Sequence, residues 1–154
     1  MKSEGIKIIA TNKKAYHDYE VVETFEAGIV LQGSEVKSIR RGSISLKEGY
    51  VKIKNGELIL TKCNVSPYSA SSFFSHEPLR DRKLLMHKRE IMRLQGKVQE
   101  KGLTIVPLKV YFKKGNIKIE IGLVRGKKQY DKRAEARKKT IEREIQTALK
   151  GYRH

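Results

Sequence analysis

A short stretch near the C-terminus combines the residue types that bind phosphate groups and flat rings. Gly126–Arg133 reads Gly-Lys-Lys-Gln-Tyr-Asp-Lys-Arg, so cations, one aromatic ring and one carboxylate lie side by side. Lys and Arg side chains neutralise phosphates, and a Tyr ring can stack on a base. The stretch therefore suits contact with a nucleic acid. Basic termini are also often only solvated and disordered, and on these residues alone both interpretations stay open.

Few other residues are spaced for chemistry. No glycine-rich nucleotide-binding motif is present, and Cys63, His76 and His87 lack the close pairing of zinc ligands, so we expect no metal and no cofactor. His17 and Asp18 are adjacent, but neighbours in a helix or strand point apart, so no catalytic pair is expected there. A metal-independent ribonuclease remains an alternative because an acid–base pair need not be close in sequence. We expect the protein not to be an enzyme.

The composition indicates a polyanionic partner. The 154 residues hold 34 Lys+Arg against 17 Asp+Glu, a net charge of +17. Such a field attracts RNA, DNA or an anionic membrane surface. Membrane is the weaker choice, since no apolar run is long enough to span a bilayer and the N-terminal apolar run is too short for a signal peptide. The single cysteine fits a reducing compartment, and we expect the protein in the cytoplasm.

The charge is distributed unevenly and predicts two parts. Residues 122–154 hold 11 Lys+Arg against 4 Asp+Glu. The alternation of apolar and polar residues that is typical of a sheet also ends near residue 124. We therefore predict a compact body at 1–124 and a basic C-terminal tail at 125–154. In the tail, Ile141, Ile145 and Leu149 form only a narrow apolar seam. We expect a tail that is disordered when free and helical when docked, the alternative being a helix packed permanently on the body.

Two hairpins are the clearest elements of the body. Asn55-Gly56 is the preferred pair for a two-residue type I′ turn, here between predicted strands at 46–54 and 57–64. The strands at 103–113 and 116–124 alternate apolar with polar or small residues on either side of a Lys-Gly corner. Pro107 lacks an N–H group, which predicts a bulge or a free edge at that position.

Shorter elements complete the predicted order. Residues 6–10 form an extended lead, 19–31 a strand interrupted by a bulge or bend at 26–28, and 66–81 a loop. Helices are predicted at 13–18, 35–41 and 88–101, with Ser34 and His87 as caps of the last two. Closure removes exposed strand edges, so such a sheet closes most economically as a small barrel. The predicted fold is mainly β: an OB-like closed antiparallel barrel of about six strands, with three short helices and the tail.

Six segments, in order along the chain, carry short motifs: Asn12–Tyr19, Phe25–Ile29, Gly33–Ser38, Arg82–Glu90, Lys101–Leu108 and Gly126–Arg133. Together they closely resemble bacterial small protein B, the family of SsrA-binding proteins. Each motif alone is modest, but six in register are specific. The match runs from about Ile8 to Leu149.

The resemblance implies a function in trans-translation. The OB-like barrel would bind the tRNA-like domain of tmRNA and deliver it to stalled ribosomes, for ribosome rescue and peptide tagging. The tail would enter the decoding centre and the empty mRNA channel of the small subunit. Elongation factor Tu would join through the tmRNA complex, and the protein would be a monomer. The alternative is an OB-fold protein that binds ribosomal RNA generally.

The resemblance ties Asn12, Glu26, Leu85 and Lys118 to tmRNA binding by position, and it ties Asp131–Arg133 to the decoding centre. The residues expected to bind tmRNA are Asn12, Lys13, Lys14, Glu26, Glu35, Lys37, Leu85, His87, Lys88 and Lys118. Those expected in the decoding centre and mRNA channel are Lys127, Lys128, Tyr130, Asp131, Lys132, Arg133, Arg137, Lys138 and Lys139. Glu26, expected to be buried, would either accept hydrogen bonds from base amino groups and 2′-hydroxyls or hold an ion pair of the fold. Tyr130 stands where some members carry His.

Overall fold

The computed structural model describes residues 5–67, 76–100 and 102–126. The strands are β1 (Ile6–Thr11), β2 (Tyr19–Ile29), β3 (Ile44–Ser45), β4 (Tyr50–Lys54), β5 (Glu57–Thr61), β6 (Asn64–Val65), β7 (Arg82–Leu85), β8 (Leu103–Lys113) and β9 (Asn116–Gly126). The helices are α1 (Lys13–Asp18), α2 (Gly33–Arg40) and α3 (Lys88–Val98). The middle of the predicted loop at 66–81 and the predicted tail helix lie outside the described residues.

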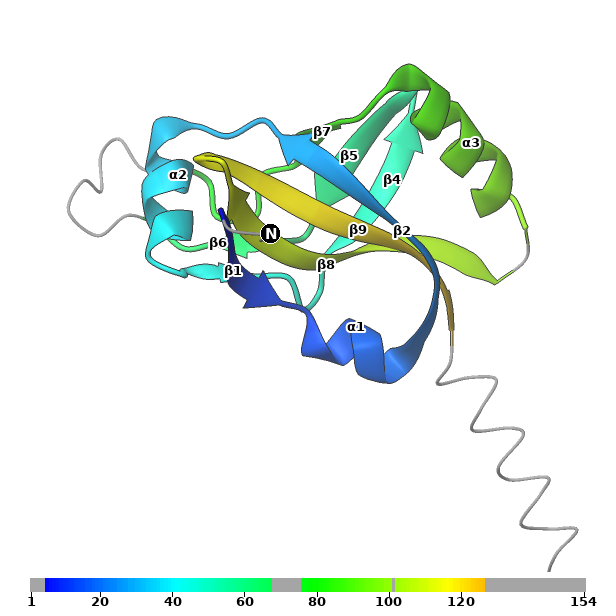
Figure 1. The fold of residues 1–154 in the computed structure, drawn as a ribbon, viewed down its shortest axis with the longest axis horizontal. Coiled ribbons are helices and arrows are strands. Elements are labelled where there is room, and N and C mark those ends of the chain that lie inside the picture. Colours follow the sequence, from blue (N-terminus) through cyan, green and yellow to red (C-terminus); the bar gives the residue numbers. More distant parts are fainter. Residues whose placement is uncertain (1–4, 68–75, 101, 127–154) are drawn as a thin grey trace, which may run out of the picture.

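Six strands form a ring. β8, β4, β5, β7, β2 and β9 pair antiparallel in that order, and β9 pairs back to β8 (Figure 1). Closing the ring leaves none of these six strands as a free sheet edge, which is the physical reason for the arrangement. The prediction of a mainly β body built on about six strands is thus confirmed. β3 and β6 form a separate two-stranded pair.

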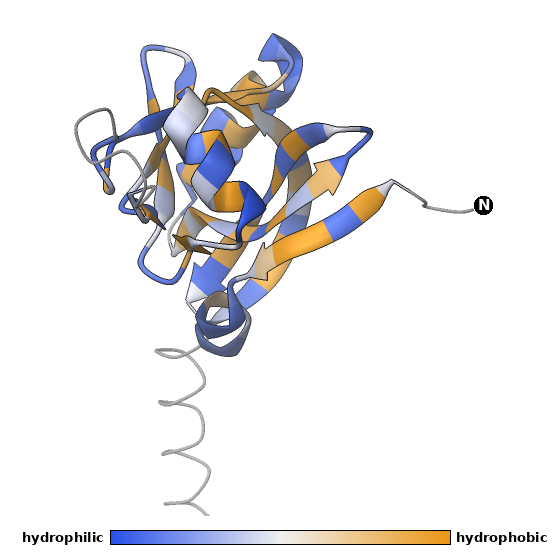
Figure 2. Cartoon of the chain, turned by 90° about the vertical axis from the view of Figure 1, so that its left-hand side faces the viewer, coloured by the Kyte–Doolittle hydropathy of each residue, from blue (hydrophilic) through white to orange (hydrophobic). Residues whose placement is uncertain are grey.

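β1 pairs with the C-terminal half of β8, at residues 109–113, and so extends the sheet beyond the ring. The predicted extended lead is a paired strand, with Ile6 opposite Lys113 and Thr11 opposite Lys109. Figure 2 shows β1 as a largely hydrophobic strand next to the N-terminus. Ile6 and Ile8 remain about half exposed, at 46% and 54%. β1 therefore contributes pairing more than burial.

The predicted turns and bulge are confirmed. Asn55 and Gly56 have φ angles of 53° and 76°, as a type I′ turn requires, and the β8–β9 corner at Lys114–Gly115 has 52° and 80°. The register of β8 against β9 shifts between Pro107 and Lys109. A strand that lacks one N–H donor accommodates the gap by bulging.

The predicted bend in the long strand at 26–28 is wrong. β2 runs unbroken from Tyr19 to Ile29, and its register shift against β9 falls between Val21 and Glu23 instead. A Cβ atom at Gly28 would lie 3.4 Å from the Leu85 Cβ of β7, which is ordinary van der Waals contact. The glycine that suggested a bend therefore lies within a regular strand, opposite Leu85 of β7 and Lys118 of β9.

The first predicted hairpin is shorter than expected. β4 begins at Tyr50, and the chain before it turns so that Gly49 lies against the buried Cys63 sulfur, where no side chain would fit. β5 ends at Thr61, because Lys62 has a φ of 62° and breaks the strand before β6. Alternation alone does not reveal such interruptions.

The helix boundaries and caps also differ in part. Gln32 precedes α2 and its N–H donates to Glu35 Oε1 at 2.7 Å, whereas Ser34, the predicted cap, bonds His76 Nδ1 at 2.8 Å. His87 stands at the N-cap of α3 but makes no side-chain capping bond. α3 ends at Val98, three residues before the predicted end.

The core fills the ring from several strands and from two helices, α2 through Ile39 and α3. Its largest cluster includes Phe25, Ala27, Leu58, Leu60, Leu84, Ile91, Leu94, Ile105, Val110, Ile119, Ile121 and Leu123, all buried. Ile91 and Leu94 bring α3 onto this core. A second cluster lies on the opposite face of β8 and β9, where Ala15 of α1 packs with Val106, Leu108 and Val124. The three helices thus cover different parts of the ring (Figure 1).

Candidate nucleic-acid-binding surface

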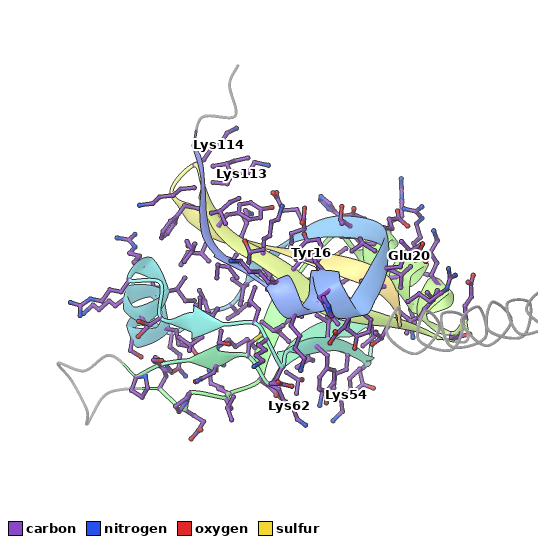
Figure 3. The ribbon with its side chains drawn as sticks, turned by 90° about the horizontal axis from the view of Figure 1, so that it is seen from below. Tyr16, Glu20, Lys54, Lys62, Lys113 and Lys114 are labelled. Carbon is purple, nitrogen blue, oxygen red and sulfur yellow. The ribbon has the colours of Figure 1, made fainter. Side chains whose placement is uncertain are left out.

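Positive charge alone does not locate a site on this protein. Figure 3 shows Lys113 and Lys114 together at the β8–β9 turn, while Lys54 and Lys62 lie on another side of the molecule. The chain holds 34 Lys+Arg, and the lysines labelled in Figure 3 already lie on more than one side of the molecule. A candidate site therefore needs a concave surface and other chemistry besides cations.

Four of the residues predicted to bind RNA line one surface hollow. Glu26 comes from β2, Leu85 from β7, His87 from the start of α3 and Lys118 from β9, and together they line a hollow of about 550 Å³. We call it the Glu26 hollow. Strand pairing explains the assembly, since Gly28 of β2 lies opposite both Leu85 and Lys118. Segments far apart in sequence are thus brought together in one hollow.

Leu85 is an apolar side chain held on the surface. In β7, Arg82 and Leu84 are buried while Lys83 and Leu85 point outward, and Leu85 is 51% exposed. A single exposed leucine is ordinary on a protein surface. The position of Leu85 is what makes it a candidate, because it forms the wall of a hollow that also holds Lys118.

Glu26 is exposed, so the expectation that it is buried is wrong. Its side chain is 39% exposed on the outer face of β2. The Tyr111 hydroxyl donates a short hydrogen bond to Glu26 Oε2, and Lys113 Nζ lies 3.2 Å from the same oxygen. The Tyr111 bond, joined by Lys113 and Lys118, lowers the pKa of Glu26 despite partial desolvation. The carboxylate is therefore charged, oriented and still open to solvent.

Tyr111 reports the same interaction from the other side. Burial raises the pKa of the Tyr111 phenol, and the bond to the Glu26 carboxylate raises it further. The hydroxyl consequently keeps its proton and can act as a permanent donor to Glu26. Sequence reasoning missed both Tyr111 and Lys113, because only the antiparallel register of β2, β9 and β8 places them beside Glu26.

Asn12 belongs to the scaffold of the fold. It is 3% exposed, its Oδ1 accepts from the Ala15 N–H at 3.0 Å, and its Nδ2 donates to the carbonyls of Leu46 and Pro107 at 3.0 and 2.9 Å. The side chain thus caps α1 and ties it to the β8 bulge. The prediction that it contacts RNA directly does not fit a side chain that is buried and fully hydrogen-bonded.

Lys13 and Lys14 lie apart from the Glu26 hollow. Both are exposed on α1, and Lys14 pairs with Glu48 at 3.2 Å. The hollow beside them, about 310 Å³, includes Lys47 and Tyr50 and shares no lining residue with the Glu26 hollow. The residues predicted to bind tmRNA therefore divide between two regions of the surface.

Glu35 is fully buried in a network of arginines. Its carboxylate accepts from Arg82 Nε at 2.7 Å and from an Arg80 Nη at 2.6 Å, and both Glu35 and Arg82 are 0% exposed. Burial would raise the pKa of Glu35, but the bonds from Arg80, the Gln32 N–H and Arg82 outweigh it and lower the pKa. Direct contact with RNA is closed to this side chain, contrary to the prediction. Its place is structural, joining α2 to β7.

The remaining predicted residues are surface cations or lie outside the described residues. Lys37 is exposed on α2, and Lys88 is exposed at the first position of α3, next to His87. The residues predicted for the decoding centre, from Lys127 to Lys139, lie outside the described residues. His17 and Asp18, expected to point apart, lie 3.0 Å apart between Nδ1 and Oδ1, because they close the last turn of α1. The His17 side chain is 83% exposed, and it lines neither the Glu26 hollow nor the hollow beside Lys14.

The described residues hold neither a metal-binding cluster nor a membrane-spanning helix. Within 5–67, 76–100 and 102–126, no three His, Cys, Asp or Glu side chains gather closely enough to hold a metal ion. In the same part of the chain, no helix has the length and apolar character needed to cross a membrane.

Burial raises the pKa of the Cys63 thiol to about 12, which makes this buried cysteine unreactive.

Comparisons with known proteins agree with one another. The family model described as SmpB protein matches residues 9–151. Proteins described as SsrA-binding protein are 55% identical over 147 residues in Persephonella marina and 60% identical over 144 residues in Carboxydothermus hydrogenoformans. These alignments cover 96% and 94% of this chain and 97% of each relative. A chain of the solved structure described as "tmRNA-SmpB: a journey to the center of the bacterial ribosome" is 49% identical, with a TM-score of 0.66, and the match covers 77% of this chain and 83% of that chain.

Proposed function

The chain belongs to the SmpB protein family, and from this premise we propose that it binds tmRNA and acts with it on the ribosome in trans-translation. The relatives are described as SsrA-binding proteins, and the matching structure is described as tmRNA-SmpB in the bacterial ribosome. The observation in this chain that carries the proposal is the Glu26 hollow. It combines an apolar wall, a cation and an oriented carboxylate on one concave surface.

The chemistry of the hollow suits an RNA elbow. RNA is recognised where its bases are unstacked and where its 2′-hydroxyls and phosphates are accessible. Lys118 and Lys88 would meet phosphates, Leu85 would cover the face of a base or a sugar, and the charged Glu26 would accept from base amino groups or 2′-hydroxyls. An ionised carboxylate repels phosphate at that point, so it favours one orientation of the RNA. The tRNA-like domain of tmRNA is the proposed ligand.

The fold and the tail complete the proposal. The six-stranded ring acts as an OB-like closed barrel at 1–124, and the basic tail at 125–154 becomes helical in the decoding centre and empty mRNA channel of the small subunit. Elongation factor Tu joins through the tmRNA complex, and the protein works as a cytoplasmic monomer without catalysis. These parts rest on the sequence motifs of the family.

The test compares two leucines of equal exposure. Leu85→Ala truncates the wall of the hollow, and Leu79→Ala truncates a leucine that is 54% exposed outside it. Binding to the isolated tRNA-like RNA is measured for both by filter binding. Leu85→Ala should weaken binding about tenfold, which is the loss of roughly 1.4 kcal/mol, and Leu79→Ala should leave it unchanged. Equal affinities would remove the Glu26 hollow from the RNA contact.

A general affinity for ribosomal RNA is the second candidate function, favoured only by the distribution of cations over several faces. Competition separates the two. A protein specific for the tRNA-like RNA should keep it in the presence of excess ribosomal RNA fragments at physiological salt, whereas a general binder should release it. Recovery of intact RNA after incubation also argues against the ribonuclease alternative.

A further inference from the structure

A second hollow lies on the other side of Leu85. It has a volume of about 360 Å³ and is bounded by α2, the end of β2, β7 and the β8–β9 turn. Its apolar walls include Val36, Leu85 and Ile117, and Arg40 and Lys118 also line it. We call it the Val36 slot. It shares Gly28, Leu85 and Lys118 with the Glu26 hollow, so the two hollows form one continuous surface divided by a leucine.

The walls of the slot are held firmly. α2 is anchored from below by the buried pair of Glu35 with Arg82 and by Ile39, which is 0% exposed. Ile117 is partly buried and packs against the main core. Val36 is partly exposed on this anchored helix and belongs to neither core cluster. The fold thus presents an apolar side chain to the slot that it does not need for its own core.

The charges of the slot differ from those of the Glu26 hollow. None of the residues that line the slot is acidic, whereas Arg40 and Lys118 are cationic. The Arg40 guanidinium lies 5.8 Å from the centroid of the Phe112 ring, which steadies its plane. An apolar slot with cations beside it is suited to a flat, uncharged ring that carries an anionic group at its edge. Its volume is within the range of ligand pockets, about 300–1,000 Å³.

We propose that the Val36 slot receives one unstacked nucleobase of the bound RNA, with Arg40 and Lys118 on the adjoining phosphates. This inference rests on the proposed function, because the slot continues the surface that would hold the tRNA-like RNA. Exposed loops of RNA offer unstacked bases, and such bases are bound by apolar, aromatic or guanidinium surfaces. The apolar wall distinguishes the slot from a patch that attracts phosphate alone.

The experiment uses a substitution that separates apolar contact from charge. Val36→Lys adds a cation but removes the apolar wall, and Val22→Lys is the matched control, since Val22 is 45% exposed on β2 and lines neither hollow. Affinity for the tRNA-like RNA is measured at several salt concentrations with the full-length chain. Val36→Lys should bind about tenfold more weakly, whereas Val22→Lys should bind equally well or slightly more tightly because of the added charge.

Chemical probing of the RNA gives a second readout. With the unsubstituted protein, one unpaired base should lose reactivity toward reagents that modify base edges, and Val36→Lys should restore it while protection next to the Glu26 hollow persists. If Val36→Lys binds as tightly as Val22→Lys and protects the same bases, the slot holds no base. That result leaves the proposed function intact provided that Leu85→Ala still weakens binding. Loss of neither affinity would instead overturn the RNA contact of the whole surface.

Discussion

Replacing Asn12 tests whether a residue aligned with tmRNA binding acts on the RNA or on the fold. The structure gives its side chain three hydrogen bonds inside the protein, one accepted and two donated. Asn12→Ala should therefore lower the free energy of unfolding while leaving the RNA affinity of the folded protein within about twofold. The free energy of unfolding is measured by urea unfolding and the RNA affinity by titration, both on the same preparation of protein.

The magnitude follows from the three bonds. Loss of a helix N-cap costs about 1 kcal/mol, within a range of about 0.5–2. Each lost bond to a carbonyl costs about 1 kcal/mol, and more where the acceptor is left buried without a partner. The Leu46 carbonyl keeps a bond from the Gly49 N–H at 2.9 Å, which limits that loss. The expected total is about 3 kcal/mol, a large share of the roughly 5–15 kcal/mol that stabilises a small domain.

Two further variants sharpen the assay. Asn12→Ser keeps an oxygen that can cap α1 but loses both amide donors, so it should recover about 1 kcal/mol of the loss. Asn64→Ala, at an exposed asparagine of β6, should change neither quantity. Unfolding is followed by far-ultraviolet circular dichroism, and RNA binding is measured at a temperature at which every variant is folded. A variant Asn12→Ala with unchanged stability and RNA binding weakened more than tenfold would refute the structural role.

The remaining predictions concern salt, acid and the tail. Affinity for the tRNA-like RNA should fall with salt concentration, with a log–log slope of several units. Lys88→Ala should reduce this slope by about one, whereas Glu26→Ala should leave it unchanged because it removes no cation. An unchanged slope for Lys88→Ala would exclude a contact between Lys88 and phosphate. The lowered pKa of Glu35 means that its share of stability is complete above its unfolded pKa of about 4.3 and is lost as pH falls through the lower folded value. The stability difference between the unsubstituted protein and Glu35→Gln should accordingly shrink below about pH 4; a constant difference in acid unfolding would contradict it. Truncation after Gly126, where β9 ends, should leave RNA binding intact and abolish peptide tagging by stalled ribosomes in a reconstituted system. Alanine at 131–133 should reproduce that separation, and normal tagging by this triple variant would remove the decoding-centre role from these residues.

The elements that sequence predicted well are those with a local physical cause. The Asn55-Gly56 turn, the alternation on either side of the β8–β9 corner and the bulge at Pro107 each follow from the conformational preferences of a few adjacent residues. β7 was missed because its alternation is hidden. An arginine occupies an inward position at Arg82, and a leucine occupies an outward position at Leu85. No single-residue preference predicts an inward arginine, because its cause is Glu35, 47 residues earlier in the chain.

The same distinction separates the site residues. Sequence reasoning named Glu26, Leu85, His87 and Lys118 as RNA-binding residues, and the fold brings all four to one hollow. It also named Asn12 and Glu35, which the fold uses internally. A family motif does not tell whether a residue is kept for contact or for structure, since both uses require the same side chain. Burial and hydrogen-bond partners decide between them, and these are known only once the strands are paired.

The acidic residue in the proposed RNA surface can be understood from the pairing of three strands. Glu26 on β2 lies beside β9, and β9 lies beside β8, so Tyr111 and Lys113 of β8 reach the carboxylate from one side and leave the other side open. Lys113 and Lys118 offset its charge toward approaching phosphates. The Tyr111 hydroxyl, whose raised pKa keeps it protonated, fixes the direction of the carboxylate lone pairs. Glu26 is thereby available as an oriented acceptor for amino or hydroxyl groups of RNA, while the net positive field of the body still attracts the phosphate backbone.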